Sequence, residues 1–338
     1  MNTVLITGGS GYIGTHLCYQ LLKNNINVVI VDNFSNSNKT AIRRCSKLSN
    51  CPIVLVDSDI NDISMLNFIF RERKIDAVFH LAGLKSVPQS ITDPLKYYAN
   101  NISGTLSLLR AMKESNINKL IFSSSATVYD SENKIPFSEN GILKTTNPYG
   151  MTKLVSEQMI KDHGNTDLNF KYVILRYFNP IGAHPSGLMG EDSSKGSTNL
   201  MPILCDVALR KRHSFVIYGK DFNTVDGTPV RDYIHIDDLC RGHINALNSI
   251  DFLNNITLNL GSGVGTSVLQ LVNKFAKVND VEIPIYYDNR RDGDVATMVA
   301  DISLAKTLLQ WQPLKTIEDA CKTAYQWAKK NPKGYPLK

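Results

Sequence analysis

The stretch Gly-Gly-Ser-Gly-Tyr-Ile-Gly at residues 8–14 decides the fold of this chain. It directly follows the apolar run at residues 4–6 and directly precedes an amphipathic pattern of helical spacing at residues 15–23. A strand that turns through glycines into a helix presents backbone N–H groups to a phosphate. The stretch therefore predicts a phosphate-binding turn between a strand and a helix.

An acidic residue follows this turn at the distance that a dinucleotide site requires. The second apolar run, residues 28–31, ends in Asp32, eighteen residues after Gly14. A carboxylate at that place accepts hydrogen bonds from the adenosine ribose hydroxyls and would repel a 2′-phosphate. The turn and the acid together predict that the cofactor is NAD rather than NADP.

Short apolar runs alternate with amphipathic stretches through the first half of the chain. The predicted strands cover residues 4–7, 28–32, 53–57, 77–81, 119–124 and 172–176, and the predicted helices cover residues 12–24, 63–73, 94–113 and 149–162. Strands separated by helices form right-handed crossovers and a parallel sheet with helices on both faces. We therefore expect an α/β protein: a Rossmann-type, doubly wound parallel sheet with a smaller C-terminal α/β substrate lobe.

The pattern loosens between residues 179 and 199, where glycine, proline, serine and asparagine are dense. We expect an NAD-binding domain at residues 1–178 and a substrate lobe over most of residues 179–338, with room for segments that return to the first domain. Residues 261–265, Gly-Ser-Gly-Val-Gly, resemble a phosphate loop but lack the later glycine of the fingerprint. They predict a plain strand-to-helix turn capped by Thr266 or Ser267.

The composition excludes several classes of partner. The 338 residues carry a net charge of +6, with 43% apolar and 20% charged residues, which are ordinary values for a globular protein. The basic cluster at residues 210–212 is short and lacks interleaved aromatic side chains, so no nucleic acid partner is expected.

No apolar run approaches the ~20 residues of a membrane span, and the N-terminus lacks a signal-peptide pattern. The cysteines are scattered without C-x-x-C pairs. We expect a cytoplasmic protein with reduced thiols, no membrane contact and no metal site.

Tyr149 and Lys153 are four residues apart, so they share one face of a helix. A nearby ammonium stabilises the phenolate and lowers the pKa of the tyrosine, which could then take a proton from a sugar or alcohol hydroxyl. In isolation a structural tyrosine and a solvated lysine explain this spacing better. The context changes the interpretation, because Ser125 directly follows the predicted strand at residues 119–124, where its hydroxyl can bond the same substrate oxygen.

A glycine turn, a strand-end serine and a Tyr-x-x-x-Lys pair form the signature of the short-chain dehydrogenase/reductase superfamily. Further stretches, at residues 80–85, 123–129, 175–180, 182–187 and 231–235, resemble the UDP-glucose 4-epimerase family of its extended branch, over essentially the whole chain. The resemblance implies an isomerase of galactose and carbohydrate metabolism that interconverts UDP-galactose and UDP-glucose. It also implies a homodimer, with residues 94–113 and 149–162 at the interface.

The resemblance implies a role for many individual residues. Tyr149 exchanges the O4 proton while bound NAD, which is not consumed, takes and returns the C4 hydride; Lys153 and Ser125 assist it. NAD contacts are implied at Gly8, Gly11, Tyr12, Ile13, Gly14, Asp32, Asn33, Asn36, Ser37, Asp59, Ile60, Ala82, Lys85, Asn100 and Phe178. UDP-sugar contacts are implied at Asn179, Asn199, Leu200, Val216, Tyr218, Arg231, Arg291 and Asp294. His184 and His235 lie in matching motifs, where we expect structural hydrogen bonds.

Two positions bear on the reaction type. Dehydratases and decarboxylases of the same branch carry carboxylates directly after the strand-end hydroxyl residue. This chain has Ala126 and Thr127 there, which cannot act as acid or base. These two residues argue against a dehydratase or decarboxylase. Another NAD-dependent nucleotide-sugar enzyme of the same branch, either a ketoreductase with exchangeable cofactor or a dehydratase, and a non-catalytic dinucleotide sensor remain as alternatives.

Met298 bears on substrate choice. A tyrosine typically occupies this place in bacterial relatives restricted to glucose and galactose, and a smaller residue in those that also accept N-acetylated sugars. Because methionine is narrower and more pliable than tyrosine, we hypothesise that UDP-GlcNAc and UDP-GalNAc are also substrates.

Overall fold

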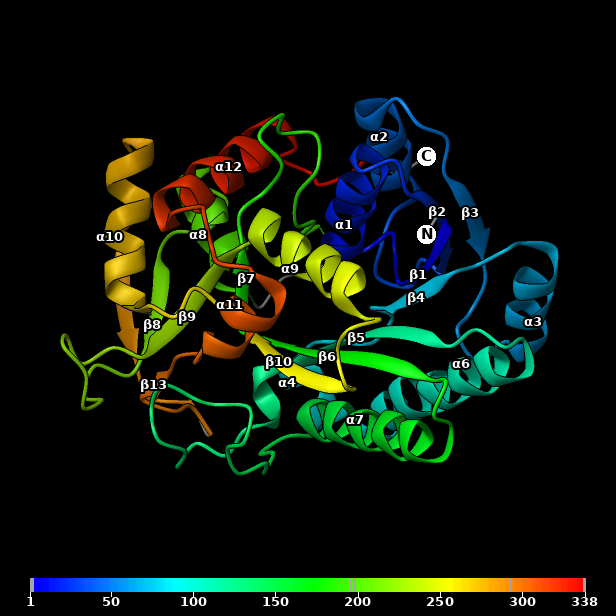
Figure 1. Cartoon of the computed structure of the whole chain (residues 1–338). Coiled ribbons are helices and arrows are strands. Elements are labelled where there is room, and N and C mark those ends of the chain that lie inside the picture. The colour runs from blue at the N-terminus through cyan, green and yellow to red at the C-terminus, as the bar shows by residue number, and fades with distance from the viewer. Residues whose placement is uncertain (1–2, 195, 197–198, 292, 337–338) are drawn as a thin grey trace.

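A seven-stranded parallel sheet organises the molecule (Figure 1). The computed structural model of the chain describes residues 3–194, 196, 199–291 and 293–336. In spatial order the strands are β10 (Ile256–Leu260), β6 (Lys171–Tyr177), β5 (Lys119–Ser125), β4 (Ala77–His80), β1 (Thr3–Thr7), β2 (Asn27–Asp32) and β3 (Val54–Asp57). All their pairings are parallel, which confirms the predicted Rossmann-type sheet.

Alternate residues of each strand build two cores, one on each face of the sheet. On one face, Val4 and Ile6 pack with side chains of α1 (Tyr12–Lys23), α2 (Lys39–Ser49), α9 (Ile236–Ser249) and α11 (Ser303–Leu309). On the other face, Leu5 packs with side chains of α3 (Ile63–Glu72), α6 (Ser103–Glu114) and α7 (Pro148–Thr166). Figure 1 shows α1 and α9 above the sheet and α6 and α7 below it. Buried strands covered on both faces explain why the strands read as continuous apolar runs.

The predicted helix at residues 94–113 is confirmed, with an irregular turn inside it that the sequence did not indicate. The chain forms α5 (Pro94–Tyr97), a π-helical turn at Tyr98–Ile102 and then α6, preceded by the short α4 (Val87–Thr92). The buried Asn101 side chain explains the wider turn, because it accepts from Leu84 N at 2.8 Å and donates to Leu84 O at 3.0 Å and to Thr152 Oγ1 at 2.9 Å. Turns of this kind are frequent at functional sites.

A smaller α/β lobe follows β6. Its strands are β7 (Asn179–Ile181), β9 (Val230–His235), β11 (Gly265–Ser267) and β13 (Thr297–Met298) in one sheet, and β8 (Phe215–Tyr218) with β12 (Ile285–Asp288) in another. Three helices, α8 (Leu200–Ala208), α10 (Val268–Asn279) and α12 (Ile317–Lys330), enclose its core. The lobe occupies the left side of Figure 1.

The chain passes between the two parts more than once. After β9 it returns to the large sheet, where α9 packs on its face and β10 pairs with β6. The division into two domains at residue 178 stays a prediction. The turn after β10 is less plain than expected, because β11 intervenes before α10. The expected cap is confirmed at Ser267, whose Oγ accepts from Gln270 N at 3.0 Å.

Among the described residues, every helix is too short or too polar to traverse a bilayer.

Candidate active site

The glycine turn between β1 and α1 forms a cradle that side chains would fill. Gly8 has a φ of +70°, and a Cβ there would lie 2.7 Å from the backbone of Ala82. A Cβ at Gly14 would lie 2.6 Å from Gly8 O. No side chain caps α1 at Gly11. Ser10 Oγ is buried and has no hydrogen-bond partner among the described residues. A buried hydroxyl without a partner and a helix N-terminus free of a side-chain cap fit the phosphates of a dinucleotide.

Asp32 lies at the end of β2 beside this turn. Its carboxylate accepts hydrogen bonds from Ser10 N at 2.9 Å, Phe34 N at 2.9 Å and Ser37 Oγ at 2.8 Å. Two carboxylate oxygens offer about four acceptor sites, so capacity for a ribose hydroxyl remains. The acid therefore fixes the glycine turn and also fits the role expected from the sequence. The bond from Ser10 N was not expected, since the spacing alone does not indicate it.

The next strand end adds a second polar group. Asn33 Nδ2 donates to Asp59 Oδ2 at 2.6 Å, and Asn61 N and Nδ2 each donate to Asp59 Oδ1 at 2.8 Å. Burial acts to raise the pKa of Asp59, but these hydrogen bonds prevail and lower it. Two predicted cofactor residues, Asn33 and Asp59, are thus joined directly.

Ser125 and Tyr149 come together where β5 ends and α7 begins. The Ser125 side chain acts on the Tyr149 phenol and lowers its pKa, against the effect of burial. Ser125 Oγ also accepts from Thr127 N at 3.2 Å and Thr127 Oγ1 at 3.0 Å. Thr127 therefore orients the serine, a role that sequence reasoning missed when it judged Thr127 only for acid–base capacity.

Lys153 points to the backbone rather than to the tyrosine. Its Nζ donates to Ser123 O at 2.7 Å and lies 4.9 Å from the centre of the Phe122 ring. Burial raises the pKa of Tyr149 to about 12, with the Ser125 side chain acting in the opposite direction. Burial lowers the pKa of Lys153 to about 8. The expectation that Lys153 lowers the pKa of Tyr149 is therefore wrong for the protein alone, because burial dominates.

Residues from separate segments of the small lobe meet around Asp294. Arg291 Nε donates to Asp294 Oδ2 at 3.0 Å, and Arg231 Nη2 lies 3.7 Å from Asp294 Oδ1. The Arg291 guanidinium lies 4.7 Å from the centre of the Tyr218 ring. Met298 is the register partner of Arg231 on the neighbouring strand. Two cations, an aromatic ring and a carboxylate in one place fit a nucleoside diphosphate.

Met298 lies beside an apolar cluster that borders Ser125. It packs against a buried cluster that includes Ala126, next to Ser125, and Phe178. The remaining predicted residues lie on elements that border these groups: Tyr12, Ile13 and Gly14 on α1, Asn36 on the loop after β2, Ile60 after β3, Ala82 and Lys85 after β4, Asn100 in the π-helical turn, Asn179 on β7, Asn199 and Leu200 at the start of α8, and Val216 on β8.

Both histidines of the matching motifs serve local structure. His184 Nδ1 lies 2.8 Å from Ser186 Oγ. His235 Nδ1 accepts from Asp237 N at 3.0 Å and so caps α9. Burial lowers the pKa of each imidazole.

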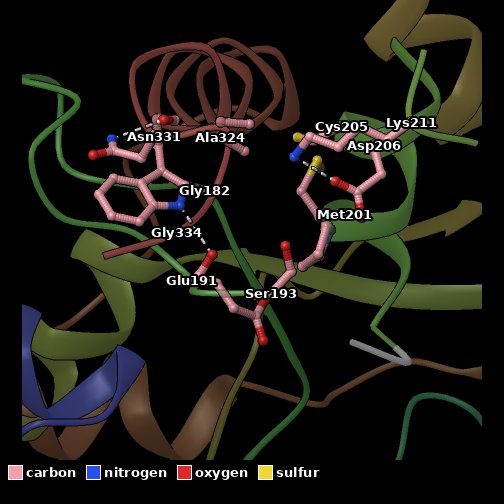
Figure 2. Close-up of a pocket in the computed structure, with 13 residues that line it drawn as sticks. Gly182, Glu191, Ser193, Met201, Cys205, Asp206, Lys211, Ala324, Asn331 and Gly334 are labelled. Carbon is pink, nitrogen blue, oxygen red and sulfur yellow. Dashed lines mark hydrogen bonds and ion pairs between the residues drawn. The ribbon is translucent and has the colours of Figure 1, made fainter. Parts of the chain in front are cut away.

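A separate cavity lies under α8 and α12 (Figure 2). Its volume of about 30 Å³ has room for water but not for a sugar nucleotide. Glu191, Cys205, Asp206 and Trp327 contribute to its wall, which contains none of the predicted site residues. The cavity is therefore not the predicted substrate site.

Comparison with known proteins agrees with this arrangement. The family model described as the NAD dependent epimerase/dehydratase family matches residues 4–261. This chain belongs to that family. The matched region begins in β1 and ends directly after β10, so it spans the whole large sheet.

Individual members of the epimerase/dehydratase family match over nearly the full length. The UDP-glucose 4-epimerase of Bacillus subtilis (strain 168) is 43% identical, with 98% of each chain covered. The solved structure of the Bifidobacterium longum UDP-glucose 4-epimerase in complex with NAD⁺ and UDP gives a TM-score of 0.95 at 43% identity, covering 99% of this chain and 100% of that one. The Stenotrophomonas maltophila enzyme, with bound NAD and formylated UDP-arabinopyranose, gives 0.96 at 41% identity, covering 98% and 99%.

Proposed function

We propose that this chain is a UDP-hexose 4-epimerase that interconverts UDP-galactose and UDP-glucose with NAD as a retained cofactor. The observation that carries the proposal is the placement of Ser125, at the end of β5, with Tyr149, in the first turn of α7, with Ala126 and Thr127 beside Ser125. This site can exchange one proton with a sugar hydroxyl, and the two positions after Ser125 supply no carboxylate for elimination. The glycine turn and Asp32 fit NAD, which supplies a reversible hydride acceptor when bound.

Each catalytic residue acts on the O4 proton. The Tyr149 oxygen takes that proton and later returns it. Ser125 Oγ donates a hydrogen bond to O4, and Thr127 holds Ser125 in place. In the complex with NAD and substrate, we propose that the Lys153 ammonium supplies the positive charge that supports the Tyr149 phenolate.

The UDP group is held more firmly than the hexose. Arg231 and Arg291 bind the diphosphate, Tyr218 stacks on the uracil and Asp294 accepts from the uridine ribose, while Asn179, Asn199, Leu200 and Val216 complete the contacts. Firm binding at UDP with loose binding at the sugar lets the 4-keto sugar present either face. Met298 borders the space for that rotation, and we propose that it admits the 2-acetamido group of N-acetylated sugars.

Two other readings have less support. A ketoreductase needs a cofactor that exchanges during turnover. The relatives that match nearly the whole chain are 4-epimerases, which favours the epimerase over the ketoreductase. A dinucleotide sensor has no need of a tyrosine placed beside a strand-end serine.

Assembly and location are part of the proposal. Exposed apolar side chains lie in the segments expected at a dimer interface, with Leu95 at 78%, Leu106 at 42% and Met151 at 37% exposure. They support a homodimer formed through α5, α6 and α7. The free cysteines support a cytoplasmic protein with reduced thiols.

Product analysis tests the proposal. Purified protein incubated with UDP-galactose and no added NAD should yield UDP-glucose. No conversion even after NAD is supplied would overturn the epimerase assignment, whereas conversion that requires a continuous supply of NADH or NADPH and ends at a reduced product would favour the ketoreductase.

A further inference from the structure

One carboxylate oxygen joins the two halves of the proposed site. Glu191 Oε1 accepts a hydrogen bond from Lys85 Nζ at 2.9 Å and another from Asn199 Nδ2 at 2.5 Å. Lys85 follows β4 of the large sheet, on the proposed cofactor side. Asn199 is the residue before α8 of the small lobe, on the proposed substrate side. The Glu191 side chain is 13% exposed, whereas the Lys85 side chain is 56% exposed.

The backbone of Glu191 is fixed independently of its side chain. Trp327 Nε1, on α12, donates to Glu191 O at 2.9 Å, the contact drawn in Figure 2. The next residue, Asp192, accepts from Tyr335 N at 3.2 Å and from Ser194 N at 2.9 Å. The carboxylate is thus presented from an anchored segment, and its two donors come from segments far apart in the sequence.

A carboxylate beside two anionic ligands is electrostatically unfavourable by itself, so its benefit must come through the groups that it holds. The Lys85 ammonium has three N–H donors, and the Asn199 amide has two N–H donors and an acceptor oxygen. Each can therefore keep its bond to Glu191 while it also contacts a ligand oxygen. A ligand that fixes either Lys85 or Asn199 also fixes the Glu191 carboxylate to which both are bonded. Fixing the other donor then costs less conformational entropy, so the second ligand binds more tightly.

We propose that Glu191 is a positioning residue that couples the cofactor site to the UDP-sugar site through Lys85 and Asn199. This inference rests on the proposed function, because it takes from that function which ligand each donor meets. It assigns Glu191 no contact with the reacting atoms. Its consequence is that NAD and UDP strengthen each other's binding by the same factor.

Equilibrium dialysis of radiolabelled UDP against the NAD-loaded protein, and against protein from which NAD has been removed, measures that factor, because the coupling is reciprocal. In the unaltered protein NAD should tighten UDP binding by about 5-fold or more. In Glu191→Gln, which keeps the size of the side chain but loses its charge, the factor should fall toward 1. Glu318→Gln is the matched control: it makes the same change in an ion pair with Lys274, outside the residues assigned to either ligand, and should keep the full factor.

A thermodynamic cycle assigns the effect to the hydrogen bonds described here. Lys85→Met should reduce the factor as Glu191→Gln does, and the double variant should lose no more than either single variant. An unchanged factor in Glu191→Gln, or an equal loss in Glu318→Gln, would overturn the inference. The inference would also be overturned if NAD and UDP bound to the unaltered protein without changing each other's affinity. Failure to bind either NAD or UDP would instead count against the proposed function itself.

Discussion

Arg176 and Glu157 form a bidentate ion pair inside the protein. Arg176 Nε donates to Glu157 Oε1 at 2.9 Å and Nη2 donates to Oε2 at 2.6 Å, with both side chains at most 1% exposed. Ser124 Oγ donates to the same carboxylate at 2.5 Å. Glu157 lies one helical turn after Lys153 on α7, so the pair fixes the catalytic helix to β5 and β6.

Removal of one partner of this pair should destabilise the fold. Glu157→Gln leaves the Arg176 charge buried without its counter-charge, which typically costs about 3–5 kcal/mol in the free energy of unfolding. Urea denaturation measures the change. Lys161→Met is the control, because Lys161 lies 3.5 Å from Glu157 but is 31% exposed, and its loss should cost less than about 1 kcal/mol. Equal losses in the two variants would contradict the account.

Tyr149→Phe should remove the proton transfer and leave the binding sites intact. We expect kcat for UDP-galactose to fall by about 100- to 10,000-fold, as is usual for loss of a general acid–base group. NAD retention through gel filtration should not change. Tyr172→Phe, on β6 in the core, removes a phenol oxygen elsewhere and should keep its kcat. A Tyr149→Phe variant with near-normal kcat would exclude Tyr149 as the acid–base group.

The activity should decline on the alkaline side through Lys153. Burial lowers the pKa of this amine to about 8. The ammonium is therefore charged below that pH and loses its charge as the pH rises through it. An uncharged Lys153 no longer supports the Tyr149 phenolate in the complex. The pH profile of kcat should fall there with a one-proton dependence. Lys153→Arg stays charged at all these pH values, so its residual activity should lack the decline; the same decline in that variant would assign it to another group.

Met298→Tyr should separate the two classes of substrate. A tyrosine fills the space that a 2-acetamido group needs, so conversion of UDP-GalNAc should be lost while conversion of UDP-galactose persists. Met298→Leu is the size-matched control and should keep both activities. Chromatography of the products with each substrate gives the result. Loss of both activities in Met298→Tyr, or of neither, would exclude Met298 as the determinant.

Continuous apolar runs located the large sheet from sequence because most of its strands are buried on both faces. The six predicted strands end within one residue of the observed ends. The helix α2 escaped prediction, since its segment is mostly polar and places only Ala41, Ile42, Cys45 and Ser49 in the interior. The π-helical turn depends on the contact of Asn101 with Leu84, and no periodicity within either segment reveals it.

The sequence predicted which residues form the candidate site but not the contacts among them. Sequence spacing placed Tyr149 and Lys153 on one helix face, but the bond of Lys153 to Ser123 O depends on how α7 packs against β5. Likewise Asp32 could be named from its distance to the glycine turn, whereas Glu191 could not, because its two donors lie in segments that only the fold brings together.

The central claim is that hydride leaves and returns to the same sugar carbon within one bound complex. The direct measurement uses UDP-galactose deuterated at C4, incubated with the protein in ordinary water without added NAD, followed by mass and NMR analysis of the UDP-glucose formed. We predict UDP-glucose that retains deuterium at C4. Exchange of that deuterium for solvent hydrogen would contradict the account, because it would mean that C4 loses a proton rather than a hydride.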